Sequence, residues 1–135
     1  MAGYSGTPLA KKLGLKPGAK LYVIAPPADY ATLLAPLPEG VAILTKPPKG
    51  GADIVHLFAE SEAAFKTALP KARQAIKTEG AIWVSWYKKA AGIPTDLTED
   101  AIRTQALQTD LVDVKVCAVS EIWSGLKFVV RKALR

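Results

Sequence analysis

The chain has 135 residues, of which half are apolar and 22% are charged, and its formal net charge is +6 at pH 7. This length fits one domain that needs no disulfide or metal to stabilise its core, and the single cysteine, Cys117, excludes an internal disulfide. No apolar run approaches the roughly 18 residues of a membrane span, and the N-terminus lacks the apolar core of a signal peptide. We therefore expect one cytoplasmic domain over residues 1–135, with a loose leader at 1–6 and no membrane partner.

Short helices alternate with apolar strands in the first half of the chain. Thr7 is a typical N-cap with Pro8 at the first helical position, which predicts a helix that ends at Leu13 with Gly14 as a left-handed stop. Proline and glycine then separate segments whose apolar runs are typical of buried parallel strands. The expected elements are a strand at 21–25, a helix at 29–34, a strand at 41–44 and a strand at 54–59.

The second half predicts two longer helices and a closing hairpin. Ser61 can cap a helix that runs to about Lys77, and Pro70 must break or kink it or start a second piece. After a strand at 81–86 and a helix at 98–108, two strands at 114–119 and 126–131 are close enough to pair antiparallel. Gly125, before the last strand, is expected to supply a backbone angle that other residues resist. This order predicts a mainly parallel, Rossmann-like three-layer α/β sandwich with a C-terminal antiparallel hairpin.

Three segments resemble class I methyltransferases, which use S-adenosylmethionine as the methyl donor. Asp53–Phe58 is similar to the central strand of that family, and Lys77–Val84 resembles its glycine-containing segment and the strand that follows. Leu111–Val116 and the closing hairpin resemble its reversed terminal strands. The resemblance implies a methyltransferase-like fold over most of the chain.

A more specific resemblance is to a widespread, uncharacterised bacterial family of small proteins. That resemblance runs from one end of the chain to the other and implies no particular activity. The segments that carry it are Gly6–Gly14, Lys16–Gly18, Pro94–Glu99, Leu111–Val119 and Trp123–Phe128.

The turn after the first strand departs from the methyltransferase pattern. That family has a glycine-rich turn there, because glycine lets the backbone approach the cofactor closely. This chain has two prolines and no glycine between Ala25 and Asp29. The family also has an acidic residue after its second strand to hold the ribose, whereas this chain has Thr45 and Lys46. We therefore expect no bound cofactor.

Neither a metal site nor a catalytic group is predicted. One histidine and one cysteine are too few for a usual zinc site. His56 lies in an apolar strand, where it is either a hydrogen-bonded core residue or a titrating group near a pocket. It can meet Ser85 if their strands are neighbours, but the sequence has no nucleophile elbow around a serine.

Candidate ligand-binding residues follow from the fold class. Open α/β sheets bind ligands beyond the carboxyl ends of their strands. The loop after the fourth strand combines aromatic surface with two cations, Lys88 and Lys89, and also contains Thr95, so it suits an anionic or aromatic ligand. The candidates at these strand ends are Asp29, Tyr30, Glu60, Ser61, Ser85, Trp86, Lys88 and Asp96.

Three functions remain open from the sequence. The first is a non-catalytic binding or interaction domain on a degenerate methyltransferase-like scaffold, whose partner is a small molecule or a protein. The second is a small methyltransferase-like enzyme with an unusual cofactor loop. The third is a basic nucleic-acid-binding module, but the cations are spread along the whole chain, so a nucleic-acid partner is not expected. The sequence does not predict an oligomeric state.

Overall fold

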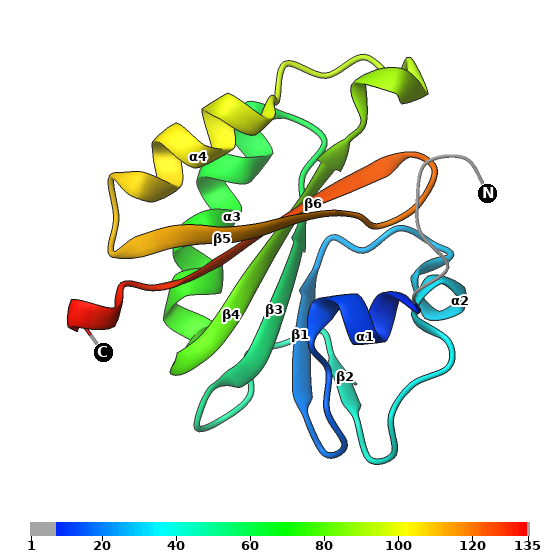
Figure 1. Cartoon of the computed structure of the whole chain (residues 1–135), viewed down its shortest axis with the longest axis vertical. Helices are drawn as coiled ribbons and strands as arrows, with labels where there is room; N and C mark the ends of the chain where they lie inside the picture. The colour runs from blue at the N-terminus through cyan, green and yellow to red at the C-terminus, as the bar shows by residue number, and fades with distance from the viewer. Residues whose placement is uncertain (1–7, 135) are drawn as a thin grey trace.

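A computed structural model describes residues 8–134, which form a six-stranded sheet with helices packed against it (Figure 1). Across the sheet the strands lie in the order β2-β1-β3-β4-β6-β5. Their bounds are β1 Lys20–Ile24, β2 Ala42–Leu44, β3 Ala52–Phe58, β4 Ile76–Tyr87, β5 Leu111–Ala118 and β6 Trp123–Val130.

Strand directions confirm the expected topology. β2, β1, β3 and β4 are parallel, whereas β6 runs antiparallel to both of its neighbours, β4 and β5. β1 and β3 occupy interior positions, where both faces of a strand are covered, and this explains their nearly continuous apolar sequences. The mainly parallel α/β sandwich with a terminal antiparallel hairpin is therefore correct.

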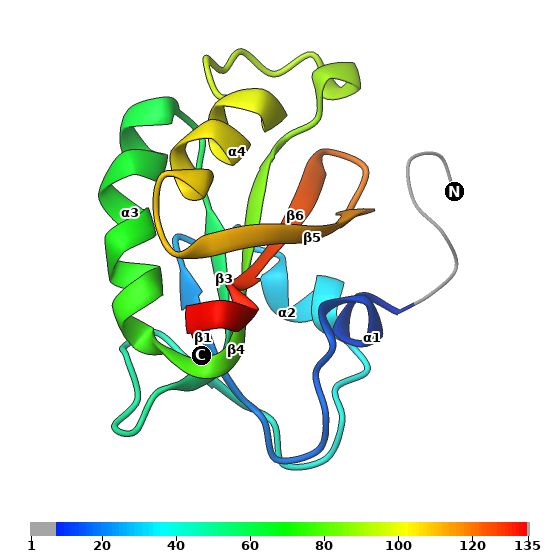
Figure 2. The same cartoon turned by 60° about the vertical axis from the view of Figure 1, so that its left-hand side comes forward.

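Helices cover the two faces of the sheet in pairs (Figure 2). α1 (Leu9–Leu13) and α2 (Tyr30–Leu34) lie on one face, and α3 (Glu62–Ala75) and α4 (Glu99–Leu107) lie on the other. Two short 3₁₀ helices, Lys89–Ala91 and Lys132–Leu134, complete the structure. Each face has its own buried apolar cluster, so the protein has the three layers that the sequence predicts.

Side-chain caps fix where the two long helices begin. The Ser61 hydroxyl accepts a hydrogen bond from the Ala64 N–H at 3.1 Å, and Thr98 does the same for Ala101. Each bond satisfies one of the donors that the first helical turn leaves without an intrahelical partner. The predicted starts of both helices are therefore confirmed.

Pro70 does not interrupt α3, so a break at this residue was a wrong expectation. The helix continues through it from Glu62 to Ala75. Leu69 and Ala72, on either side, are buried against the sheet. Their burial offsets the loss of one backbone hydrogen bond at the proline.

Several predicted boundaries are corrected. Thr7 lies outside the described residues, and Pro8 takes the N-cap position rather than the first helical one. The backbone of Gly14 is left-handed, with φ 84°, as expected. α3 ends at Ala75 rather than near Lys77, because β4 already begins with Ile76 opposite Ala52. β5 and β6 each begin three residues earlier than predicted.

Gly125 is needed for space and not for its backbone angle, which corrects the sequence-based expectation. It lies inside β6, and its φ is not in the left-handed region. A Cβ at this position would lie 2.9 Å from a Val119 methyl carbon and 3.3 Å from Cε3 of Trp83. The missing side chain therefore lets the Trp83 ring and Val119 pack against the strand.

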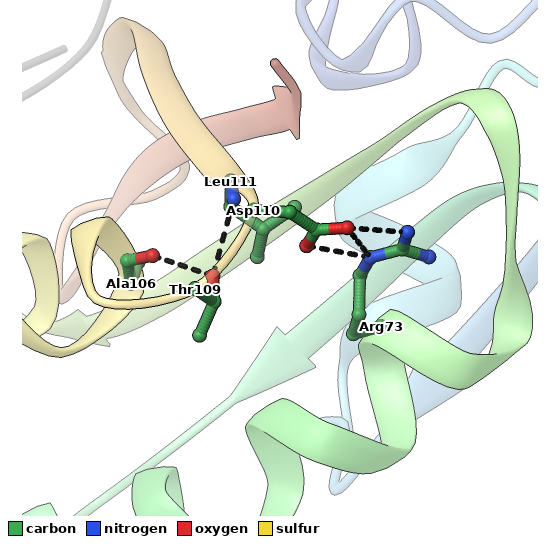
Figure 3. A network of polar contacts seen from close by, with 5 residues as sticks. All are labelled: Arg73, Ala106, Thr109, Asp110 and Leu111. Atoms are coloured by element: carbon green, nitrogen blue, oxygen red, sulfur yellow. Dashed lines mark hydrogen bonds and ion pairs between the residues drawn. The ribbon is translucent and has the colours of Figure 1, made fainter. Parts of the chain in front are cut away.

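An ion pair ties α3 to the turn before β5 (Figure 3). The Arg73 guanidinium donates to both carboxylate oxygens of Asp110, with Nε to Oδ1 at 2.9 Å and Nη2 to Oδ2 at 2.7 Å. The Thr109 hydroxyl beside it donates to the Ala106 carbonyl and accepts from the Leu111 N–H. This network positions the start of β5 against α3.

Among residues 8–134, no helix has the length and apolar character needed to cross a membrane.

Candidate functional site

Three connections meet at the carboxyl edge of the sheet, because β1, β3 and β4 run parallel. Ala59, directly after β3, donates its N–H to the Ser85 carbonyl in β4. Glu60 accepts a hydrogen bond from the Tyr87 hydroxyl, and its carbonyl accepts one from Thr95 at 2.8 Å. This edge is where open α/β sheets bind ligands, so the structure brings together the strand ends that the sequence singles out.

A buried chain of polar side chains crosses β3 just below this edge. The Tyr30 hydroxyl lies 2.7 Å from Nδ1 of His56, and Nε2 of His56 lies 2.7 Å from the Ser85 hydroxyl. His56 and Ser85 have no exposed surface, and Tyr30 is 5% exposed. The meeting of His56 with Ser85, which the sequence left open, therefore occurs in the structure.

Burial keeps this chain uncharged. It lowers the pKa of His56 from 6.5 to about 3 and raises the pKa of Tyr30 above its usual value. A neutral imidazole has one donor and one acceptor nitrogen, so it can satisfy both hydroxyls at once. Ser85 has no access to a substrate in this arrangement. The geometry fits a satisfied core histidine that fastens α2 to the sheet, and not a nucleophile with its base.

Aromatic rings extend the buried chain toward β6. Phe58 stacks on the His56 ring, with centroids 4.2 Å apart, and meets the edge of Trp123 at 4.9 Å. Trp123 in turn stacks on Tyr87 at 4.4 Å. Trp123 is 4% exposed, and its indole N–H has no hydrogen-bond partner among residues 8–134. The rings therefore fill this part of the edge on the face covered by α1 and α2.

A cleft of about 750 Å³ opens on the α4 side, between the loop after β4 and the first turn of α4. Trp86 and Leu97 give it apolar surface, and each is almost fully buried. Both signs of charge are present, with lysines from the loop and carboxylates from α4. Its lining consists of Trp86, Tyr87, Lys88, Lys89, Gly92, Ile93, Pro94, Thr95, Leu97, Thr98, Glu99, Asp100 and Ser124. The cleft can accept a molecule with an apolar body and charged ends.

Only part of the predicted set lines this cleft. Trp86 and Lys88 do so. Ser61 and Asp96 instead hold the start of α3, where Asp96 accepts a hydrogen bond from the Glu62 N–H at 2.8 Å. Tyr30 and Ser85 belong to the buried chain, and Glu60 bonds to Tyr87. Asp29 precedes α2 without a side-chain cap. Six of the predicted residues therefore divide among the cleft, the start of α3 and the core, whereas Asp29 and Glu60 belong to none of these groups.

Sequence reasoning missed the far wall of the cleft. Ser124 faces the cleft because β6 pairs with β4, which places Ser124 directly opposite Trp86. The hairpin of β5 and β6 was predictable, but the position of β6 between β4 and β5 was not. In the sequence, Glu99 and Asp100 indicate the start of a helix, where acidic side chains are favourable. That pattern does not show that the first turn of α4 also lines the cleft.

The turn after β1 fits S-adenosylmethionine poorly. Ala25 has a left-handed φ of 53°, and the two prolines after it have no N–H to offer a ligand. The Pro27 carbonyl accepts from the Tyr30 N–H at 3.1 Å, so the turn closes on itself. No acidic residue follows β2 at positions 45–46. The turn after β1 therefore has no glycine to let a cofactor approach the backbone, and the loop after β2 has no carboxylate at 45–46 to hold its ribose.

Comparison with known proteins identifies the fold. No protein-family model matches the chain, and no curated protein matches it. Among solved structures, Methanococcus jannaschii fibrillarin, a pre-rRNA processing protein, superposes with a TM-score of 0.60 at 11% identity, covering 95% of this chain and 70% of that one. The ribosomal protein L11 methylase of Lactobacillus delbrueckii subsp. bulgaricus gives 0.57 at 8% identity, covering 91% and 75%. The B. subtilis M1A22 tRNA methyltransferase TrmK gives 0.54 at 10% identity, covering 96% and 68%.

These likenesses define a class of fold. The chain has the Rossmann-like α/β fold of class I methyltransferases, and the methyltransferase-like layout inferred from the sequence is correct. Sequence identities of 8–11% show the fold alone, since one fold supports many functions.

Proposed function

We propose that the protein is a non-catalytic binding or interaction domain on a methyltransferase-like fold, with its ligand in the cleft beside β4. The observation that carries this proposal is a contrast between two places at one edge of the sheet. The turn after β1 is closed by prolines and its own hydrogen bond, whereas a cleft of about 750 Å³ opens after β4. A cleft of this size suits a small organic molecule.

Its lining favours a ligand with an aromatic or apolar body and an acidic group. Trp86 and Leu97 provide apolar contact, and Lys89 is an exposed cation at the cleft. Charge-assisted hydrogen bonds from a lysine orient an acidic group. The resemblance to an uncharacterised bacterial family is part of this proposal. One of the segments that carry this resemblance, 94–99, contributes several residues to the cleft.

A methyltransferase-like enzyme is the second candidate. The similarity to solved methyltransferases favours it more than it favours the first candidate. The backbone of Ala25, directly after β1, also favours the enzyme. Ala25 has a strained left-handed conformation that glycine adopts without cost, and a glycine-rich turn is what class I methyltransferases have at this place. In this candidate the cofactor would lie near 25–30 and 58–61.

Calorimetric titration with S-adenosylhomocysteine at millimolar concentration separates the two candidates. We expect no heat and no thermal stabilisation, because the turn lacks both glycine and the acidic residue. Saturable binding at micromolar affinity, about −8 kcal/mol, would instead support the enzyme. In that case Asp29→Asn and Glu60→Gln should weaken binding, and unchanged binding in both variants would rule out the proposed cofactor position.

An anionic aromatic probe tests the cleft itself. We expect anilinonaphthalene sulfonate to bind the folded protein saturably, with a rise in probe fluorescence. Lys89→Glu should weaken this binding about three- to tenfold, because it places a negative charge beside the sulfonate. Lys49→Glu, in the exposed loop between β2 and β3, makes the same charge change away from the cleft. Equal affinities of the two variants would exclude the cleft as the binding place.

A further inference from the structure

Three lysines, one each from α1, β5 and β6, gather on the α1 face of the sheet. Lys115 in β5 lies directly opposite Lys127 in β6, and Lys12 in α1 donates to the Ala118 carbonyl at 2.9 Å. Lys127 also pairs with Trp83 of β4, whose indole N–H donates to the Leu13 carbonyl of α1. Residues directly opposite each other share a face, so both strand lysines lie on the side of α1. We call Lys12, Lys115 and Lys127 the lysine cluster.

The surroundings of Cys117 also indicate that Lys12 and Lys115 lie close together. Burial raises the pKa of its thiol, and the positive charges of Lys12 and Lys115 oppose that rise. Both ammonium groups are therefore near the same side chain. The packing of α1 against the end of β5 therefore brings Lys12 close to Lys115, although the sequence separates them by more than one hundred residues.

The two strand lysines, Lys115 and Lys127, have no acidic partner among residues 8–134. Like charges directly opposite each other destabilise a strand pair. The ion pairs of that part of the chain involve α3, α4 or the amino end of β3 instead. Before Asp29 the sequence contains four lysines and no acidic residue. The segment that contains α1 and the start of β1 therefore has a positive net charge.

We propose that the lysine cluster docks the phosphate backbone of a nucleic-acid duplex. Flexible lysine stems suit phosphate contacts that need no base readout. The three tryptophans are buried, with exposures of 0%, 4% and 6%, so they cannot stack on unpaired bases as single-strand binders require. The expectation of no nucleic-acid partner rested on the spread of lysines along the chain, and the strand pairing of Lys115 and Lys127 removes that reason.

A duplex fits better than a membrane surface. Interfacial membrane binding needs exposed apolar side chains beside the cations. The exposed Val116 is opposite Leu126, which belongs to the core cluster under α3 and α4. The exposed Ile43 lies in β2, at the other edge of the sheet. Neither can insert into lipid beside the lysine cluster. Val114, next to Lys115, and Ile122, at the β5–β6 turn, are also exposed, but two separate side chains form no continuous apolar surface.

Fluorescence anisotropy of the full chain with short labelled RNA and DNA duplexes tests the proposal. We expect binding at low salt whose log Kd against log salt has a slope of at least about 2, because Lys115 and Lys127 each neutralise about one phosphate. The double variant K115Q/K127Q should weaken binding about tenfold or more and lower the slope by about 2. The double variant K46Q/K49Q removes the same charge from an exposed loop and should change binding by less than about twofold.

Circular dichroism shows whether both double variants stay folded, and we expect K115Q/K127Q to be at least as stable as the wild type because it removes a repulsion. Two results would overturn the proposal: no duplex binding at low salt, or equal weakening by the two double variants. Binding to phosphatidylserine vesicles but to neither duplex, lost in K115Q/K127Q, would assign the surface to lipid instead.

Discussion

Replacing Trp83 by alanine is expected to lower the free energy of unfolding by about 3–5 kcal/mol. Trp83 is the largest fully buried side chain among the described residues, with no exposed surface. Its indole N–H also donates to the Leu13 carbonyl at 3.1 Å, so truncation leaves a cavity and an unpaired carbonyl at the end of α1. Urea unfolding followed by far-ultraviolet circular dichroism measures the loss without depending on tryptophan fluorescence.

Two control variants show whether the loss of stability comes from the buried indole ring. Trp83→Phe keeps much of the ring volume and removes the N–H, so its loss should be clearly smaller than that of alanine. Val114→Ala in β5, where the side chain is 53% exposed, should change stability by less than about 0.5 kcal/mol. A Trp83→Ala loss as small as the Val114→Ala loss would show that α1 does not pack on the sheet as described.

The fold was predictable because local sequence and burial agree along most of the chain. The interior strand at 54–58 is apolar on both faces apart from His56. Ser61 and Thr98 mark helix starts through a local hydrogen bond, which depends little on the rest of the fold. The break expected at Pro70 and the backbone angle expected of Gly125 were wrong for one reason. Their local preference was weighed alone, and tertiary packing decided the outcome.

The candidate site was less predictable because residue type does not specify direction. Trp86 and Ser85 are adjacent in β4, yet successive strand residues point to opposite faces, so one lines the cleft and the other joins the buried chain. The lysine cluster shows the same effect, since Lys115 and Lys127 meet only through the β5–β6 register. The hairpin itself was predicted, but its exact register, which decides which side chains lie opposite each other, was not.

Stability should fall as the pH is lowered from 6.5 toward 4.5, because of His56. Burial lowers its pKa to about 3 in the folded state, while the unfolded chain retains a value near 6.5. Above pH 6.5 both states are neutral and the histidine has no effect. Below it the unfolded state binds a proton that the folded state refuses, so the free energy of unfolding drops by about 1.4 kcal/mol per pH unit, or about 2–3 kcal/mol over this range.

Carboxylates titrate mainly below this window, and the sequence has a single histidine, so the slope can be assigned to one group. Urea titrations at pH 6.5, 5.5 and 4.5 measure it, and His56→Gln should give a nearly flat profile if the variant folds. The imidazole proton signals of the wild type provide a test that needs no variant. Since Tyr30 and Ser85 hold a neutral ring, these signals should not move between pH 8 and 5. A midpoint near 6.5 would show that the ring is hydrated, and the buried Tyr30–His56–Ser85 chain could not then be what fastens α2 to the sheet.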